Sequence, residues 1–421
     1  MSPPSSSSHA ASARTALTHL GSAMVATGET VHEVEEELLE ASTRLGYPDV
    51  QVAAGPTGVF VSLHPGDVSA YQSVRGPLRL DQAVDVRRIL HHLLHSGLSP
   101  DDAVRQLVEL RTKSARFPRW LYWVGAVGVA VGIALILQPG WANVAAAGVV
   151  GLVVTSLSQL SARSGRLATL LPTVAAFVAA CLVFAAADAG WLDGSLRTLL
   201  PPLAVLLPGA LLVTGLSELA SGHMVAGSSR LAFGLVQLLL LSLGVLTASE
   251  VLRVPPESLG NVRVDQLGWW AAPVGLVCLS VGVCNLESAS LRLLPWILLV
   301  LVLAASAQGL GQRLSGIALG GLLGAIAASL GASACTTIRP RLPRLVIFTP
   351  AFWLLVPGSL GLLSVTALAD NPAQTIRTQI DVVNVVSAIA LGLLVGSAVG
   401  RSLDALVRRR PRATADGSTS H

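Results

Sequence analysis

Ten apolar runs of about 20 residues each place the strongest constraint on how this 421-residue chain can fold. A helix of that length matches the hydrocarbon core of a bilayer, which is about 30 Å thick. Backbone polar groups in lipid must be satisfied within the segment, so such runs form helices. The sequence therefore predicts an all-α polytopic membrane protein with ten transmembrane helices. The runs cover residues 120–137, 142–160, 167–187, 199–219, 231–248, 267–284, 291–307, 317–330, 345–368 and 382–400.

Charged residues are scarce, at 12% of the chain, and the basic ones gather beside the apolar runs. Alternate flanks carry sixteen against five of these arginines and lysines. Basic flanks stay in the cytoplasm, so both chain ends of this multi-pass membrane protein are predicted to be cytoplasmic. The same clustering indicates topology and not nucleic-acid binding. The richer set is Arg111, Lys113, Arg116, Arg119, Arg163, Arg166, Arg230, Arg292, Arg339, Arg341, Arg344, Arg401, Arg408, Arg409, Arg410 and Arg412.

The ten spans divide into two halves, residues 120–248 and 267–400, that repeat at a separation of about 150 residues. Five spans per half give the halves opposite orientations, as in the inverted repeats of many transporters. The fourth span of each half carries a Pro-Gly pair, Pro208-Gly209 and Pro357-Gly358. Proline removes a backbone donor and glycine adds freedom, so each pair is predicted to interrupt its helix and expose polar backbone. The alternative is a plain kink that serves packing.

Polar side chains at membrane depth are costly and therefore mark candidate functional positions. Glu218 lies near the cytoplasmic end of span four, Arg230 opens span five, and His223 lies in the connection. Glu218 could bind a proton, a cation or the amino group of a substrate. The alternative is a structural ion pair between Glu218 and Arg230. Three further residues could supply neutral hydrogen bonds, unless they bond their own helix backbone: Thr214, Ser359 and Asn384.

Glycines at four-residue spacing mark one face of span eight and one face of span ten. Small residues allow helices to approach closely in lipid, where packing drives association. We expect these faces to pack within one chain, and a homo-oligomer contact is the alternative. The glycines are Gly316, Gly320, Gly324, Gly392, Gly396 and Gly400.

Residues 12–114 are charge-rich and predict a small α+β domain in the cytoplasm, between a disordered tail (1–11) and the first span. Thr30 and Glu33 form a capping box at the start of a helix. The strings VQVAA and VFVSL flank GPTG, which indicates a hairpin. Ser99 and Pro100 begin a last helix, and residues 401–421 form a basic cytoplasmic tail. The expected helices cover residues 13–26, 30–45, 80–95 and 99–112.

The chain lacks the sequence signatures of nucleotide, metal or catalytic chemistry. It has no Walker A motif, HExxH or GxSxG, so we expect neither an enzyme nor a cofactor. His91, His92 and His95 share a helix, but no carboxylate or cysteine completes a metal site. The four cysteines lie in or beside apolar runs without ligand spacing, as packing residues do.

These features resemble the threonine/serine exporter (ThrE-type) family over nearly the full chain. The resemblance rests on GETVHEVEEELLEASTRLGY and ILHHLLHSGLSPDDAVRQLVELR near the N-terminus, and on LVPGSLGLLSV in the second half. Its most specific part is a string that holds Pro208, Gly209, Thr214, Glu218, Gly222, Gly227 and Arg230.

The resemblance implies export of threonine and serine driven by the proton motive force. We therefore expect a secondary transporter with alternating access, in which the two Pro-Gly breaks line a central site and Glu218 couples protons to export. The alternative within transport is export of dicarboxylates such as succinate, since split relatives are associated with those. The alternative of another class is a membrane-anchored sensor or scaffold whose N-terminal domain is the active part.

Overall fold

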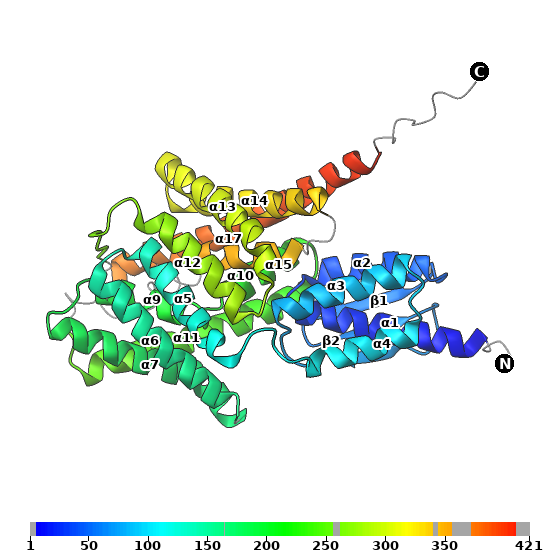
Figure 1. Ribbon diagram of the computed structural model, residues 1–421, viewed down its shortest axis with the longest axis horizontal. Helices are drawn as coiled ribbons and strands as arrows, with labels where there is room; N and C mark the ends of the chain where they lie inside the picture. Colours follow the sequence, from blue (N-terminus) through cyan, green and yellow to red (C-terminus); the bar gives the residue numbers. More distant parts are fainter. Residues whose placement is uncertain (1–5, 164, 256–261, 340–343, 356–371, 410–421) are drawn as a thin grey trace, which may run out of the picture.

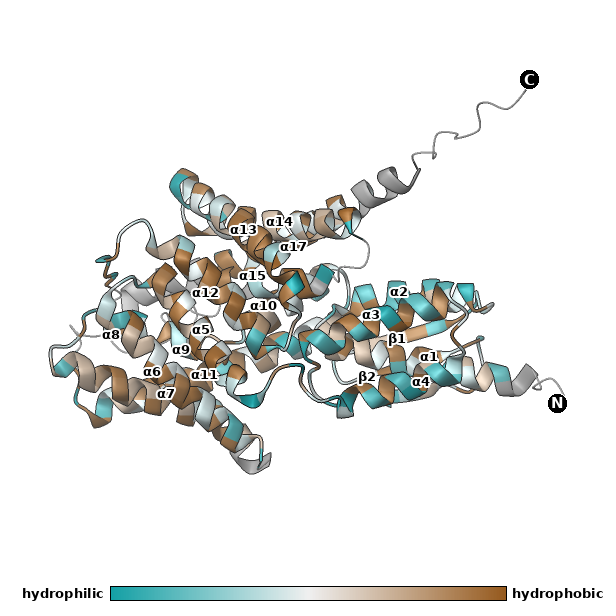
Figure 2. Cartoon of the chain, in the orientation of Figure 1, coloured by the Kyte–Doolittle hydropathy of each residue, from teal (hydrophilic) through white to brown (hydrophobic). Residues whose placement is uncertain are grey.

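A computed structural model describes residues 6–163, 165–255, 262–339, 344–355 and 372–409. Figure 1 shows an N-terminal part, blue to cyan, that lies beside one end of a larger helical bundle. Figure 2 shows the contrast in hydropathy between them: teal residues are frequent along the helices of the N-terminal part, and brown residues dominate the helices of the bundle. The Pro357-Gly358 pair and Ser359 lie outside the described residues.

The N-terminal part packs helices against a three-stranded antiparallel sheet with strand order β1-β2-β3. Val59 and Val61 of the central strand are fully buried and join a core with Leu17, Leu38 and Ile89. Its elements are α1 (Ser6–Ala26), α2 (Val31–Arg44), β1 (Gln51–Gly55), β2 (Gly58–Ser62), β3 (Ala70–Ser73), α3 (Leu80–His95), α4 (Pro100–Glu109) and the 3₁₀ turn η1 (Leu110–Thr112).

Local signals account for most of these boundaries. The Thr30 side chain accepts a hydrogen bond from the Glu33 amide at 3.3 Å, and Ser99 caps α4 in the same way. Two expectations were wrong. The first helix begins at Ser6, so residues 6–11 are helical and do not belong to a disordered tail. The sequence also gave no sign of β3, which pairs with β2 through Phe60 and Tyr71.

The bundle confirms a mostly helical polytopic membrane protein. In the part of the bundle that the structure describes, seven helices are long and apolar enough to cross a membrane, namely α5, α6, α7, α11, α13, α14 and α17, whereas α10, α12 and α15 are shorter apolar helices. Ten crossings remain a prediction. The helices are α5 (Arg119–Leu137), α6 (Trp141–Ser161), α7 (Gly165–Asp188), α8 (Ser195–Thr198), α9 (Leu200–Leu203), α10 (Gly209–Ala220), α11 (Met224–Val251), α12 (Ala271–Leu286), η3 (Leu291–Leu293), α13 (Leu294–Ser315), α14 (Ile317–Ile338), α15 (Arg344–Leu355) and α17 (Pro372–Arg409).

A glycine seam joins α5 to α12, the first helix of each half. A β-carbon on Gly125 would lie 2.8 Å from the Gly282 carbonyl oxygen, and one on Gly132 would lie 2.8 Å from that of Gly275. The residue numbers run in opposite directions along the seam, so the two helices are antiparallel. The sequence analysis did not single out these glycines, although small residues recur along α5 at the spacing typical of close helix packing.

The glycine face of α17 packs against α14 within the chain, as expected. Gly392, Gly396 and Gly400 lie against Ala325, Ser329 and Ser333 respectively, so these helices run parallel. On α14, Gly320 and Gly324 lie against α13. Gly316 does not belong to that face, which corrects the sequence-based expectation. It forms the turn between α13 and α14 with φ of 86°, a left-handed conformation that favours glycine.

The connections sort onto two sides of the bundle. On one side Gln138, which follows α5, donates a hydrogen bond to the Val262 carbonyl at 3.2 Å, and Asn143 donates one to the Asp193 carbonyl at 2.7 Å. On the other side the N-terminal part contacts the connections after α10 and α12 and the first residue of α15. This second side carries His223, Glu287 and Arg344, whose contacts are described next.

Candidate functional site

The fourth apolar run is interrupted, as the first Pro-Gly pair predicts. Helix α9 ends at Leu203 and α10 begins at Gly209, with the buried Pro208 at its N-cap. The interruption leaves backbone carbonyls without helical partners at membrane depth. The Leu206 carbonyl accepts a hydrogen bond from Gln237 Nε2 of α11 at 2.8 Å. Sequence reasoning missed Gln237, whose signal is a single amide side chain in the apolar run that forms α11.

A cavity of about 40 Å³ lies beside this interruption, between α5, α6 and α9. Its lining includes Pro201 and Pro202 together with the hydroxyl side chains of Tyr122, Thr155 and Ser158. The Thr155 hydroxyl donates to the Gly151 carbonyl of its own helix at 2.7 Å, and its lone pairs remain able to accept. A space of this size accommodates a few water molecules.

A close crossing of α10 and α11 sets the geometry of the charged residues. A β-carbon on Gly215 would lie 2.9 Å from the Gly227 carbonyl oxygen, and one on Gly227 would lie 2.6 Å from that of Gly215. The short turn between the helices passes through Gly222 with φ of 89°. Two glycines and a tight turn therefore hold the end of α10 against the start of α11, which brings Glu218 beside Arg230.

Glu218 has a fully buried side chain with two partners, one on the neighbouring helix α11 and one in the N-terminal part. Its Oε2 atom lies 3.4 Å from Nε of Arg230, whose own side chain is only 10% exposed. Its Oε1 atom accepts a hydrogen bond from the Val31 amide, the first helical amide of α2, at 2.9 Å. The ion pair that sequence analysis held as an alternative is thus present. Removing one partner of such a buried pair strongly destabilises the folded protein, because the other charge is left buried and unpaired.

Helix α2 supplies further side chains to the same region. His223 Nε2 lies 3.0 Å from Glu35 Oε2, and the His223 ring lies 5.5 Å from that of His32. Arg344 bridges Glu33 at 3.3 Å and the Ser329 hydroxyl at 2.9 Å. The acidic string HEVEEELLE at the start of α2 was visible in the sequence, but its partners lie hundreds of residues away.

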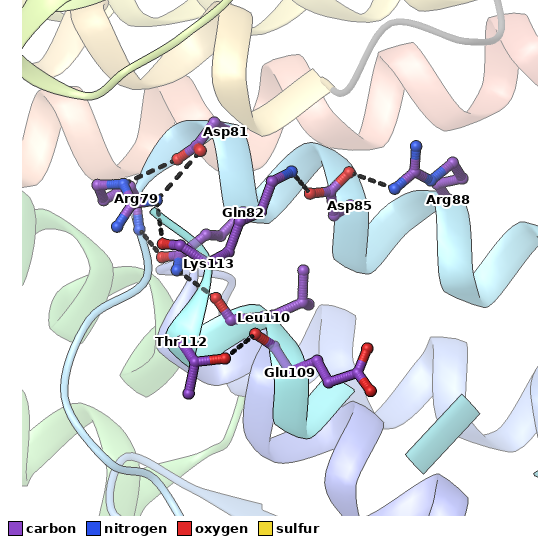
Figure 3. Close-up of polar contacts among 9 residues, drawn as sticks. All are labelled: Arg79, Asp81, Gln82, Asp85, Arg88, Glu109, Leu110, Thr112 and Lys113. Atoms are coloured by element: carbon purple, nitrogen blue, oxygen red, sulfur yellow. Dashed lines mark hydrogen bonds and ion pairs between the residues drawn. The ribbon is translucent and has the colours of Figure 1, made fainter. Parts of the chain in front are cut away.

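The start of α3 makes a second contact with the bundle. The Leu80 amide, the first of α3, interacts with the Glu287 carboxylate. Burial raises the pKa of Glu287, while the Leu80 amide and the nearby Arg79 charge act in the opposite direction. Arg79 is held in turn by Asp81 at 3.0 Å and by the Lys113 carbonyl at 3.2 Å, as Figure 3 shows. The only lysine of the chain also pairs with Asp85.

The predicted site residues therefore lie in separate regions of the structure and do not form one site. Glu218, His223 and Arg230 come together, and Thr214 is buried one turn before Glu218 on the same helix. Pro208 and Gly209 lie at the opposite end of α10, about 15 Å along the helix axis from Glu218. Asn384 is exposed on α17 and does not join either place. Within the described residues, no three His, Cys, Asp or Glu side chains form a group that could hold a metal ion.

Comparison with known proteins gives consistent matches. The model of the threonine/serine exporter family (ThrE) matches residues 15–252, more than half of the chain. A protein of Mycobacterium tuberculosis named probable threonine/serine exporter is 26% identical over 330 residues, which cover 74% of this chain and 61% of that protein. Pheromone-regulated membrane protein 10 of Debaryomyces hansenii is 30% identical over 237 residues, 53% of this chain and 23% of that protein.

The matched regions leave much of the relatives uncovered, since this chain spans about a quarter of the length of the fungal proteins. No solved structure matches the chain. The matched residues 15–252 contain most of the N-terminal part, the interrupted helix, Glu218, His223 and Arg230, so the family match includes the cluster described above. The chain belongs to the threonine/serine exporter family.

Proposed function

We propose that this protein is a secondary active exporter of small amino acids, with threonine and serine as substrates and the proton motive force as energy source. The observation that carries the proposal is the buried Glu218–Arg230 pair, at 3.4 Å, in a helical hairpin of a family member. An ionisable pair inside a membrane bundle is expensive, and proton relays and substrate sites are the usual reasons for it.

Glu218 is the group that exchanges protons in this proposal. When Glu218 is ionised, Arg230 is neutralised by it. When Glu218 takes up a proton, Arg230 loses its counter-charge and becomes available to the carboxylate of a solute. Arg230 would pair with an amino acid or a dicarboxylate equally well, so the ion pair explains coupling to carboxylate-bearing solutes and does not select among them.

Alternating access would come from two inverted five-helix repeats with ten crossings. The antiparallel seam of α5 and α12 supports this arrangement, because the first helices of inverted repeats must run in opposite directions. Two corresponding pairs also support it: α7 packs on α11 in the first half, and α14 packs on α17 in the second. The interruption at Pro208 and the adjacent cavity would form one wall of the solute path.

We place the N-terminal part and both chain ends in the cytoplasm of a bacterial plasma membrane. Two independent features support this orientation. The arginine-rich flanks include Arg230, Arg292 and Arg344. The N-terminal part contacts that same side of the bundle, through the Glu33–Arg344 pair and the Val31–Glu218 hydrogen bond.

The test is flux in proteoliposomes that contain the purified full chain, with an imposed pH gradient and labelled threonine, serine or succinate in separate samples. We expect threonine and serine flux that collapses with a proton ionophore. Glu218→Gln should abolish the dependence on the gradient. Glu250→Gln is the matched control, since Glu250 is exposed at the far end of α11.

Several outcomes would decide against the proposal. Succinate flux without threonine or serine flux would favour the dicarboxylate alternative. The absence of flux for all three solutes would favour a sensor or scaffold. Gradient-driven threonine flux of normal size in Glu218→Gln would remove Glu218 from the coupling step.

A further inference from the structure

Helices α2 and α3 of the N-terminal part each begin beside a glutamate carboxylate of the bundle. The first amide of α2, Val31 N–H, donates a hydrogen bond to the Glu218 carboxylate at 2.9 Å. The first amide of α3, Leu80 N–H, interacts with the Glu287 carboxylate and lowers its pKa, and the Leu80 side chain packs in one cluster with Leu286 and Ala289 on either side of Glu287. Glu218 lies in α10 of the first half and Glu287 follows α12 of the second half. The N-terminal part is thus attached to each half of the bundle through one carboxylate.

The amides at a helix start have no partner within the helix, and they carry the positive end of the helix dipole. An ionised carboxylate at that position accepts a stronger hydrogen bond than a neutral acid and also gains from the dipole. Both contacts therefore favour the ionised form of the glutamate. A protonated carboxyl group would keep its shape and lose most of this attraction.

The other charged groups around each glutamate are few. Glu218 faces Arg230 from α11 and His223 from the preceding turn, with Glu33 of α2 as the nearby like charge. Glu287 faces Arg79 and Asp81, both at the start of α3, and these opposite charges pair with each other. The charge balance at each contact thus depends on whether its own glutamate carries a proton.

Additional contacts bridge the two parts beside these hydrogen bonds. Leu80 and Ala83 of α3 are buried in one apolar cluster with Leu286, Ala289 and Leu293 of the bundle. The Glu35–His223 and Glu33–Arg344 pairs add polar contacts to the first and second halves respectively. Because the N-terminal part is attached to both halves on one side, it resists any movement of one half against the other on that side.

We propose that residues 6–112 form a latch that protons release: ionised Glu218 and Glu287 hold the starts of α2 and α3, and protonation of these glutamates frees them. This inference rests on the proposed function and deepens it. It links the protonation of Glu218, the proposed coupling residue, to the movement of one half of the bundle against the other. By linkage, docking of the latch favours loss of the proton from each glutamate, and protonation disfavours docking by the same factor.

The test is hydrogen–deuterium exchange of the full chain in lipid nanodiscs, followed at the Val31 and Leu80 amides and corrected for intrinsic exchange at each pH. In the wild type we expect the protection of both amides to fall as the pH is lowered through the titration of the two carboxyl groups. Glu218→Gln should reduce protection at Val31, and Glu287→Gln at Leu80, by about two- to fivefold each. The double variant should show a smaller pH dependence of protection at both amides than the wild type, and the remainder reports the Glu35–His223 and Glu33–Arg344 pairs.

Two controls make the result decisive. The Val61 amide in the central strand reports whether the N-terminal part is folded, and Glu250→Gln should leave all protection unchanged. If a variant also loses protection at Val61, the pH series on the wild type decides alone. Protection at Val31 and Leu80 that is flat with pH would overturn the latch. The measurement needs no flux, so pH-dependent protection without threonine transport would overturn the transport proposal and leave the latch standing.

Discussion

Gly132 of α5 and Gly275 of α12 approach so closely that neither position has room for a side chain. A β-carbon on Gly132 would lie 2.8 Å from the Gly275 carbonyl oxygen, and one on Gly275 would lie 2.7 Å from that of Gly132. Both obstacles are backbone atoms, which cannot move without shifting a helix. The seam that joins the two halves therefore depends on the absence of both side chains.

Gly132→Ala should consequently destabilise the bundle, by roughly 1–3 kcal/mol, because the helices must separate. The matched control is Gly309→Ala in α13, where no atom lies within 4 Å of the new β-carbon. Alanine favours a helix over glycine by up to about 1 kcal/mol, so the control should be neutral or stabilising. Thermal unfolding in detergent measures both. Equal melting temperatures for the two variants would contradict the prediction that close packing of α5 on α12 leaves no room for a side chain at Gly132.

The Glu218–Arg230 pair predicts a non-additive effect. Arg230→Met leaves a buried carboxylate without its counter-charge, which costs about 3–5 kcal/mol of unfolding free energy. The double variant Glu218→Gln/Arg230→Met removes both charges and should recover part of that loss. Arg313→Met, at an exposed position of α13, is the control and should have little effect. If the double variant is as unstable as the sum of the single variants, the two side chains do not interact energetically.

Features set by local chemistry could be predicted from the sequence. The α2 start follows from Thr30 and Glu33, and the interruption follows from Pro208 and Gly209, because caps and proline breaks need only neighbouring residues. The site could be predicted only in part. Glu218 and Arg230 stand out as charges in an apolar region and lie 12 residues apart on one hairpin, so their pairing was foreseeable.

The contacts that the sequence did not reveal join distant segments. Val31 and Glu218 are 187 residues apart, and Glu35 and His223 are 188 apart. Such pairs depend on how a folded N-terminal part sits on the bundle, which no periodicity or spacing encodes. Asn384 was chosen because it is polar in an apolar run, and its exposed side chain lies apart from the Glu218–Arg230 pair, so its role in a site stays a prediction. Whether a side chain of a helix faces the bundle or the outside depends on the rotation of that helix about its axis. Packing against the neighbouring helices sets this rotation.

Gln237 should be required for the interrupted helix to keep its shape. Gln237→Met retains the length of the side chain but leaves the Leu206 carbonyl without its 2.8 Å hydrogen bond. A fully buried unsatisfied carbonyl costs about 1–3 kcal/mol, so this half-buried one should cost at most that amount and lower the melting temperature in detergent. The control is Thr247→Val on the same helix, whose exposed hydroxyl bonds only the Leu243 carbonyl one turn away. A Gln237→Met protein as stable as that control would show that this carbonyl finds another partner.

Glu29 is buried within the N-terminal part, where it shares one counter-charge with a second carboxylate. Its Oε1 atom lies 3.0 Å from Nη2 of Arg87, while Arg87 Nη1 pairs with Glu37. Its Oε2 atom is buried and has no hydrogen-bond partner among the described residues. Burial raises the pKa of Glu29 from its ordinary value near 4.5 to about 8, against the opposing effect of Arg87.

A raised pKa in the folded state means that the folded chain binds a proton that the unfolded chain releases. The stabilisation is complete below pH 4.5 and is lost as the pH rises toward 8. The slope is at most about 1.4 kcal/mol per pH unit. Glu29→Gln should remove this slope, whereas Glu40→Gln, at an exposed position of α2, should keep it. Hydrogen exchange of the Val59 and Val61 amides at pH 5, 6.5 and 8, corrected for intrinsic exchange, measures how stability changes with pH in each variant. Parallel pH profiles for Glu29→Gln and the wild type would contradict the prediction. They would mean that Glu29 is ionised at every pH tested, because its attraction to Arg87 outweighs the cost of burial.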